Sequence, residues 1–138
     1  MPLRDFTDKG LILLAEDEAA VRSFAARSLR LRGYGVVEVG SGEEALAFLA
    51  DQSVHVDLFI SDVVMPGLDG PAWVKEALLQ RPQAKVIFVS GYAEDAFQNG
   101  SANVANSLFL PKPFSLAELT ENVRSVLSDA KNSPQYRN

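Results

Sequence analysis

The stretch FISDVVMPGLDG, residues 59–70, decides the fold and gives the first indication of a functional site. It begins as an apolar, strand-like run, and a carboxylate, Asp62, closes that run. Pro66 and Gly67 then predict a turn before the next helix. Ligands of open parallel sheets bind beyond the carboxyl ends of the strands. We therefore expect Asp62 to stand open at such an edge, with the turn leading the chain away from it.

Five short, apolar, β-branched runs recur along the chain, and segments of helical period separate them. Nearly continuous apolar runs are typical of strands buried on both faces. Alternation of strands and helices implies right-handed crossovers, hence an α/β fold with a parallel five-stranded sheet and helices on both faces. The runs are LILLA (11–15), YGVVEV (34–39), VDLFIS (56–61), KVIFVS (85–90) and SLFLP (107–111).

The first and last expected helices each show one apolar face that should pack on the sheet. Capping boxes, Ser41 with Glu44 and Ser115 with Glu118, predict two helix starts, and Gly33 predicts the end of the first helix. The segment 94–107 is rich in Asn, Gly and Ser, so the fourth helix should be short or irregular. The two faces comprise Val21, Phe24, Ala25, Ser28 and Leu29, and Leu116, Leu119, Val123, Val126 and Leu127.

Length and composition limit the domain count and the classes of partner. A chain of 138 residues with 47% hydrophobic content fits one domain, which we place at 10–128 between a linker (1–9) and a flexible tail (129–138). The net charge of -5 and the lack of a basic stripe argue against direct nucleic-acid binding. The absence of a long apolar run and of a leader segment predicts a cytoplasmic domain without membrane contact. The only histidine, His55, is expected at the surface.

Polar side chains follow four of the expected strands and should meet at one edge of the sheet. Three carboxylates in one crevice repel one another unless a cation lies among them. Oxygen ligands without histidine or cysteine favour Mg²⁺ over zinc. The converging residues are Glu16 and Asp17 after the first strand, Asp62 after the third, Ser90 after the fourth and Lys112 after the fifth.

In their order along the chain, these motifs resemble those of response-regulator receiver domains, from about Leu11 to Leu127. The resemblance implies a doubly wound, flavodoxin-like (CheY-like) sheet with strand order 2-1-3-4-5. The motifs that carry it are the acidic pair ED (16–17), DVVMPGLDG (62–70), SGY (90–92) and FLPKPF (109–114).

The resemblance also implies a role for each site residue. Asp62 would accept a phosphoryl group from a phosphohistidine in a Mg²⁺-dependent reaction, and Ser90 and Lys112 would contact the phosphoryl oxygens. The expected Mg²⁺ ligands are Glu16, Asp17, Asp62 and the backbone carbonyl of Val64. We also expect a cis peptide bond between Lys112 and Pro113.

Two departures from the family pattern concern Glu16 and Phe109. Glu16 stands where many members have Asp, and its extra methylene would let it reach the metal through a water. Phe109 takes the place of the switching aromatic residue but lacks a phenolic hydroxyl, so a switch there would act by packing alone. Tyr92 would border the phosphorylation site and either cover it or pack locally.

The resemblance predicts a histidine kinase or a histidine phosphotransfer protein as partner. This partner would dock on the first helix, near Ala19 and Ala20, and charge reversal at Arg22 would probe that docking face. FVSGYAEDAF (88–97) and FLPKPFSLAEL (109–119) are similar to the C-terminal receivers of alphaproteobacterial hybrid histidine kinases of the CckA type. A free-standing single-domain regulator, monomeric or weakly dimeric, is the alternative reading.

Two other classes of function remain open. One is a Mg²⁺-dependent phosphatase with an aspartyl nucleophile, although Val64 stands where such enzymes place a second Asp as acid and base. The other is an inactive interaction module, which would be expected to lack the acceptor or the lysine. This sequence keeps both Asp62 and Lys112.

Overall fold

The structure is a computed structural model that describes residues 9–91, 104 and 107–132. Five parallel strands form one sheet in the order β2-β1-β3-β4-β5. This order and the flavodoxin-like architecture agree with the expected fold. The strands are β1 (Leu11–Ala15), β2 (Gly35–Val39), β3 (Leu58–Asp62), β4 (Lys85–Ser90) and β5 (Ser107–Pro111).

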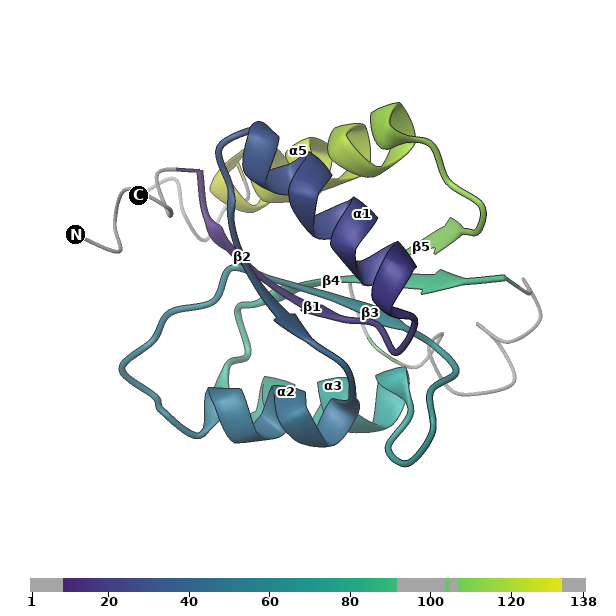
Figure 1. Cartoon of the computed structure of the whole chain (residues 1–138). Coiled ribbons are helices and arrows are strands. Elements are labelled where there is room, and N and C mark those ends of the chain that lie inside the picture. Colours follow the sequence, from purple (N-terminus) through teal and green to yellow (C-terminus); the bar gives the residue numbers. More distant parts are fainter. Residues whose placement is uncertain (1–8, 92–103, 105–106, 133–138) are drawn as a thin grey trace.

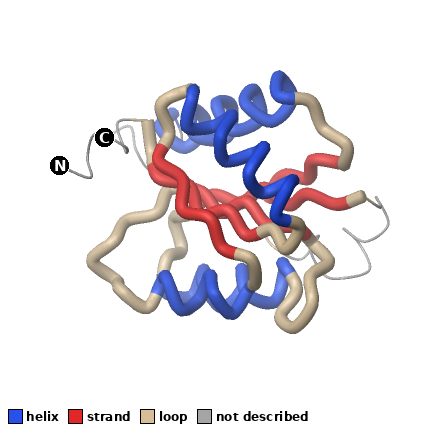
Figure 2. Tube along the Cα trace, viewed as in Figure 1, coloured by secondary structure: helices blue, strands red, loops and turns tan. Residues whose placement is uncertain are grey.

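Helices cover both faces of the sheet, as Figures 1 and 2 show. Two helices, α1 and α5, lie together on one face, and α2 and α3 lie on the other. Their bounds are α1 (Ala19–Leu31), α2 (Gly42–Leu49), α3 (Gly70–Gln80) and α5 (Leu116–Asn132). The helix expected within 94–107 falls almost wholly outside the described residues. The last helix continues beyond residue 128, where we placed the end of the domain.

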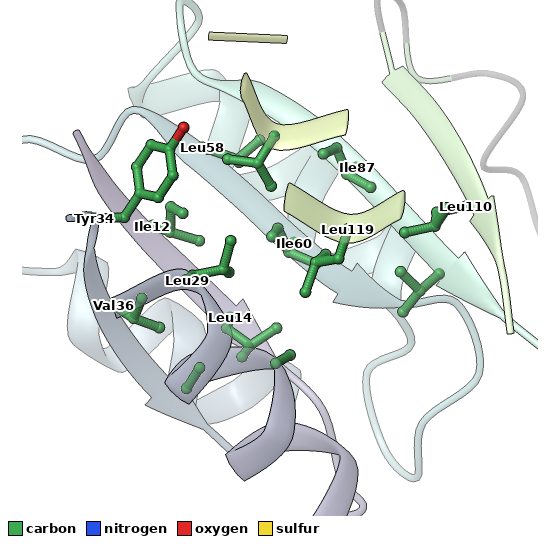
Figure 3. Close-up of a cluster of buried hydrophobic side chains, with 14 of the residues drawn as sticks. Ile12, Leu14, Leu29, Tyr34, Val36, Leu58, Ile60, Ile87, Leu110 and Leu119 are labelled. Carbon is green, nitrogen blue, oxygen red and sulfur yellow. The ribbon is translucent and has the colours of Figure 1, made fainter. Parts of the chain in front are cut away.

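The burial of β1 shows why its sequence is apolar at every position. Ile12 and Leu14 pack into the core between the sheet and α1 with α5, which Figure 3 shows from close by. Leu13 and Ala15 point to the opposite face and join the core under α2 and α3. Successive strand residues point to opposite faces, so a sheet covered on both sides needs apolar residues without alternation.

The predicted helix ends are confirmed in detail. Ser115 and Glu118 form a reciprocal capping box, with each backbone amide bonded to the other side chain at 2.9 and 3.0 Å. Ser41 caps α2 by accepting from the Glu44 amide at 3.0 Å, while the Glu44 carboxylate accepts from Gly40. Gly33 adopts a positive φ of 99° after α1, which glycine tolerates without strain.

Three sequence expectations need correction. Phe24 and Leu116 were placed on buried faces, but they are 44% and 45% exposed. The second strand begins at Gly35, since the Tyr34 amide bonds to the Leu29 carbonyl in the helix-ending turn. The third strand includes Asp62, because the ladder with β4 continues to a pair between Asp62 and Val89.

Candidate functional site

Asp62 ends β3 as a buried, paired carboxylate and is only 7% exposed. The sequence predicted an open carboxylate at this position, and the structure corrects that picture. Its Oδ2 lies 2.9 Å from the Nζ of Lys112, which donates a hydrogen bond to it. A buried carboxylate is stable only with such a partner. One oxygen of the Asp62 carboxylate is therefore held by a cation at the end of β3.

Lys112 connects Asp62 with the end of β1. It follows β5, its peptide bond to Pro113 is cis as expected, and its backbone amide donates to the Ser90 carbonyl at 2.7 Å. Its Nζ also lies 3.0 Å from Glu16 Oε1 and 3.6 Å from Glu18 Oε1. One ammonium thus contacts three carboxylates, of which those of Glu16 and Asp62 are buried.

The acidic cluster forms where β1 ends beside β3. Oxygen atoms of Glu16, Asp17 and Asp62 lie within 4.8 Å of one another. Glu16 is buried and Asp17 is exposed, so the cluster opens to solvent on the side of Asp17. The loop is fixed locally, since the Glu18 amide donates to Glu16 Oε2 at 3.1 Å. This arrangement agrees with the predicted meeting of the two strand ends.

The charges of the cluster are not balanced by Lys112 alone. Burial raises the pKa of Glu16 from 4.5 to about 7, and the charge of Asp62 adds to the rise despite opposing bonds from Glu18 and Lys112. Burial likewise raises the pKa of Asp62 against the influence of Lys112. Burial would lower the pKa of Lys112, but hydrogen bonds and the charges of Asp62 and Glu16 raise it to about 12. The two buried carboxylates share one ammonium, so a further cation in the cluster would be needed to balance their negative charge.

The donors in this cluster fit a hard divalent cation. All three side chains offer carboxylate oxygens, and the chain has no cysteine. Its only histidine, His55, has a side chain that is 80% exposed, as predicted, and pairs with Asp57 at 2.9 Å. Oxygen-only donors with excess negative charge match Mg²⁺ or Ca²⁺ better than zinc.

The turn after Asp62 is held by contacts from α2 and α3. Gly67 has a positive φ of 77°, and the next amide, that of Leu68, donates to the Glu43 carboxylate at 3.0 Å. Asp69 caps α3 by accepting from the Ala72 amide at 2.9 Å. A Cβ at Gly70 would overlap the main-chain oxygen of Asp62. The start of α3 therefore lies directly against the backbone of Asp62.

A buried polar chain that sequence reasoning missed also reaches the backbone of Asp62. The indole Nε1–H of Trp73 donates to Ser61 Oγ at 2.9 Å, and the Ser61 hydroxyl donates to the Asp62 carbonyl at 2.8 Å. Trp73 is fully buried, and its ring packs against that of Phe59. The one sequence signal was a serine inside an otherwise apolar strand.

An apolar groove lies beside the acidic cluster, between α1 and the segment that follows β5. Its volume is about 600 Å³, and Lys112 reaches it from the cluster. Phe24 stands at this groove with 44% of its surface exposed, which explains why the residue does not join the core. The lining residues are Ala20, Val21, Phe24, Gly91, Lys112, Pro113 and Phe114.

Comparison with known protein families gives one decisive match. Residues 12–124 match the response regulator receiver domain. The chain belongs to this receiver family. The receiver fold explains why the polar groups of β1, β3, β4 and β5 gather at one edge of the sheet.

Known relatives of this receiver include both a large kinase and a small regulator. It is 47% identical over 123 residues to the sensor kinase CckA of Brucella abortus, covering 89% of this chain but only 13% of that protein. It is 32% identical over 116 residues to the receiver protein CpdR of the same organism, covering 84% of this chain and 95% of CpdR. The receiver thus corresponds to a small part of one relative and to nearly all of the other.

Solved structures agree with this assignment. The receiver domain of the hybrid histidine kinase CckA superposes with a TM-score of 0.74 at 46% identity, covering 86% of this chain and 99% of that one. The response regulator TrrA of Thermotoga maritima, solved in complex with Mg²⁺ and beryllofluoride, superposes with a TM-score of 0.72 at 30% identity, covering 85% and 98%. The predicted similarity to CckA-type receivers is confirmed.

The remaining predicted site residues of the receiver lie in different surroundings. Ser90 ends β4 and is 2% exposed, and the register pairs its neighbour Val89 with Asp62. The Val64 side chain is 54% exposed. Phe109 is half-buried against the core under α2 and α3. Tyr92 lies outside the described residues, so its predicted place beside the site stays a prediction.

No helix in the described part of the receiver combines the length and apolar character needed to cross a lipid bilayer.

Proposed function

We propose that this receiver domain accepts a phosphoryl group on Asp62 from a phosphohistidine and so carries a signal in a two-component phosphorelay. The observation that supports it best is the 2.9 Å contact between Asp62 Oδ2 and Lys112 Nζ inside an acidic cluster. A carboxylate nucleophile, a neighbouring cation and a charge-rich pocket are the parts that phosphoryl transfer requires.

In the proposed reaction, an Asp62 carboxylate oxygen attacks phosphorus while the bond from phosphorus to the donor imidazole nitrogen breaks. The electron pair of that bond stays on the imidazole, which then takes up a proton. Lys112 already lies at hydrogen-bond distance from Asp62 and can donate to the incoming phosphoryl oxygens. Ser90, at the end of the neighbouring strand, would supply a hydroxyl donor. Both groups would stabilise negative charge on the transferred group.

Mg²⁺ would be held by Glu16, Asp17, Asp62 and the backbone carbonyl of Val64, and when bound it would neutralise charge on the phosphoryl oxygens. The raised pKa of Glu16 supports this role, because a cluster with unbalanced negative charge gains from a divalent cation. TrrA, which shares the fold, was solved with Mg²⁺ and beryllofluoride. Removing the metal should therefore slow phosphorylation of Asp62.

The partner that delivers the phosphoryl group would dock on the N-terminal half of α1, near Ala19 and Ala20. The apolar groove supports this location, because it joins α1 to Lys112 and exposes Phe24 beside the acidic cluster. Exposed aromatic residues next to a pocket are typical anchors of protein interfaces. A histidine kinase or phosphotransfer protein placed there would bring its histidine toward Asp62.

Phosphorylation would be transmitted by Ser90, Lys112 and Phe109. A phosphoryl dianion on Asp62 would attract the Ser90 hydroxyl and the Lys112 ammonium, and the loop after β4 would move toward it. Phe109 is half-buried on β5, whose ladder pairs it with Phe88 of β4. The ring could then shift further into the core, without a hydroxyl to hold it in water.

The chain would serve as the cytoplasmic receiver domain of a hybrid histidine kinase. The 47% identity to the CckA sensor kinase favours this origin. A free-standing regulator is the second candidate, and the nearly complete coverage of CpdR favours it. Purifying the protein from its native cells and measuring its intact mass distinguishes the two, since only a hybrid kinase would be several times larger than this domain.

The proposed chemistry can be tested by intact mass measurement after incubation with Mg²⁺ and acetyl phosphate. We expect one phosphoryl adduct that is stable in acid and lost in base, and none with Asp62→Asn, which keeps the shape but lacks the anionic nucleophile. Labelling of Asp62→Asn at the wild-type rate would contradict the assignment. Turnover of assorted phosphomonoesters would indicate a phosphatase instead, and no adduct under any condition would indicate an inactive interaction module.

A further inference from the structure

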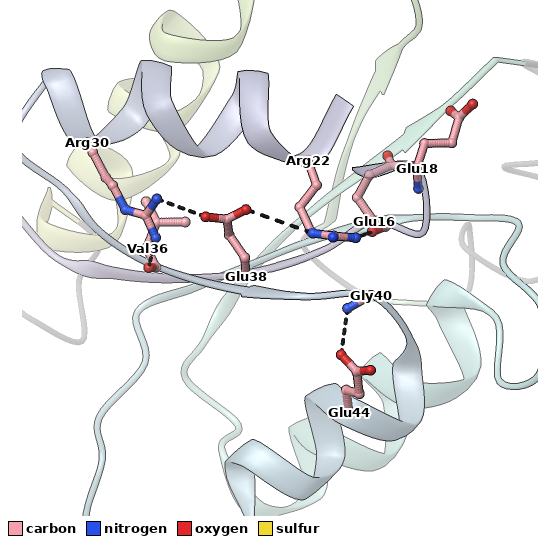
Figure 4. A network of polar contacts seen from close by, with 8 residues as sticks. All are labelled: Glu16, Glu18, Arg22, Arg30, Val36, Glu38, Gly40 and Glu44. Atoms are coloured by element: carbon pink, nitrogen blue, oxygen red, sulfur yellow. Dashed lines mark hydrogen bonds and ion pairs between the residues drawn. The ribbon is translucent and has the colours of Figure 1, made fainter. Parts of the chain in front are cut away.

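Arg22 connects α1 with the loop that carries the first two acidic residues of the cluster. Its Nη1 donates to the main-chain carbonyl of Glu16 at 2.6 Å. Its backbone amide donates to the Glu18 carbonyl at 2.9 Å. Figure 4 shows the side chain extending from α1 back to Glu16. One residue therefore holds both ends of a loop whose middle residue is Asp17.

The guanidinium of Arg22 is itself held by the edge strand β2. Its Nε lies 3.8 Å from Glu38 Oε1, and the other oxygen of Glu38 pairs with Arg30 at 2.8 Å. Figure 4 shows Glu38 between the two arginines. The Arg22 side chain is 23% exposed, so its contact with Glu16 is partly shielded from solvent. Partly buried charge-assisted hydrogen bonds are stronger than exposed ones.

The loop needs such a restraint because like charges meet there. Glu16, Asp17 and Asp62 place carboxylate oxygens within 4.8 Å of one another, and their repulsion acts to push the loop away from β3. The Glu16 amide is bonded to the Val39 carbonyl at 3.1 Å, which fixes one side of its backbone. Arg22 fixes the other side through the Glu16 carbonyl.

We propose that Arg22 is a positioning residue of the acidic pocket: it holds the Glu16 carbonyl so that the Glu16 and Asp17 side chains stay directed at Asp62 when a cation or phosphoryl group enters. This rests on the proposed function, in which these carboxylates hold Mg²⁺. Side chains that orient metal ligands change metal affinity when they are replaced, by about 10- to 100-fold in other proteins. Arg22 would therefore set the Mg²⁺ affinity without touching the metal.

The same geometry corrects the use of Arg22 as a docking probe. Ala20, Val21 and Phe24 line the groove on α1, whereas Arg22 is directed to the Glu16 carbonyl and Glu38. Charge reversal at Arg22 would disturb the acidic loop directly. A loss of phosphotransfer in that variant would then say nothing about the docking face.

The test compares Arg22→Met with Arg27→Met in the full chain. Met keeps an unbranched apolar stem and removes the donors, while Arg27 is an exposed arginine on the same helix and serves as the matched control for the lost charge. Mg²⁺ is titrated into each variant while the amide NMR signals of Asp17 and Glu18 are followed. We expect the dissociation constant for Mg²⁺ to rise about tenfold in Arg22→Met and to stay within about twofold in Arg27→Met.

A second measurement separates positioning from general destabilisation. The rate of Asp62 phosphorylation by acetyl phosphate should fall about tenfold in Arg22→Met at low Mg²⁺ and recover at saturating Mg²⁺. In the metal-free protein, the Glu18 amide, which donates to Glu16 Oε2, should exchange with solvent about tenfold faster. Glu38→Gln, which weakens the support of Arg22, should shift the Mg²⁺ affinity in the same direction by about two- to threefold.

The outcomes distinguish this inference from the proposed function. Wild-type protein that neither binds Mg²⁺ nor forms the adduct refutes the proposed function. Wild-type protein that does both, with an unchanged Mg²⁺ dissociation constant in Arg22→Met, overturns the positioning role alone. A rate that stays low at saturating Mg²⁺ also overturns it. If Arg22→Met does not fold, the Mg²⁺ affinity and Glu18 exchange of Glu38→Gln decide, and wild-type values for both overturn the role.

Discussion

The raised pKa of Glu16 predicts that the metal-free domain loses stability as the pH rises, and that Glu16→Gln removes much of this loss. Burial and the charge of Asp62 raise the pKa of Glu16 from 4.5 to about 7. The folded state therefore binds the proton more tightly than the unfolded state does. This group favours folding less and less as the pH rises from 4.5 to about 7, and the effect is constant above that range.

The magnitude follows from the shift. At 1.36 kcal/mol for each pKa unit, moving from 4.5 to about 7 corresponds to about 3 kcal/mol of lost stability well above pH 7. Between pH 5 and pH 7.5 the change is roughly 2 kcal/mol, since part of the effect is already present at pH 5. Glu16→Gln carries no charge but keeps an oxygen that can accept from the Glu18 amide. The variant should therefore be more stable than the wild type at pH 7.5.

The assay is urea unfolding at pH 5 and pH 7.5 in the presence of a chelator, for wild type and Glu16→Gln. Other titrating groups are common to both proteins, so the difference between their two pH responses isolates Glu16. We expect that difference to be roughly 2 kcal/mol. Millimolar Mg²⁺ should restore wild-type stability at pH 7.5 and affect the variant less. Equal pH responses in the two proteins would refute the reasoning on the charge of this pocket.

Three further predictions concern the lysine, the start of α3 and the groove. Lys112→Met should lower the free energy of unfolding by about 2 kcal/mol at pH 7.5 and by less at pH 5, because it leaves buried carboxylates without their cation. An equal loss at both pH values, measured by urea unfolding, would contradict this. Gly70→Ala should lower the free energy of unfolding by about 3 kcal/mol, since its Cβ would overlap the backbone of Asp62. Gly91→Ala, whose Cβ would meet nothing within 4 Å, should change the free energy of unfolding by less than about 0.5 kcal/mol. Phe24→Ser should slow phosphotransfer from a histidine donor about tenfold and leave the rate of phosphorylation by acetyl phosphate unchanged. The control is Leu31→Ser, which changes an exposed residue farther along α1. Equal rates of transfer from the histidine donor for the two variants would reject the groove as the docking face.

The sequence predicted the sheet and the strand ends well because both depend on local patterns. Apolar residues at every position of LILLA (11–15) require a strand covered on both faces, and the structure shows this arrangement. Parallel strands bring their carboxyl ends to one edge, so Glu16, Asp62 and Lys112 could be placed together before any geometry was known. The structure brings these three residues into direct contact.

The directions of individual side chains could not be predicted in the same way. Helical period placed Phe24 on the buried face, but the groove beside Pro113 leaves it exposed, and this depends on how α1 lies against the segment after β5. Arg22 has a long side chain that can point to solvent or to the backbone, and only the position of the Glu16 carbonyl decides. The bond from Trp73 to Ser61 likewise depends on tertiary packing.

Chemical trapping of the phosphorylated residue tests the central claim most directly. An acyl phosphate on aspartate is reduced by borohydride to homoserine, whereas free carboxylates are not reduced. The protein is incubated with Mg²⁺ and acetyl phosphate, reduced, digested and analysed by mass spectrometry. We predict homoserine at position 62 and at no other aspartate, and none without Mg²⁺ and acetyl phosphate. Homoserine at another position, or an unmodified Asp62 in protein that has gained the phosphoryl mass, would contradict the assignment of Asp62 as the phosphoacceptor.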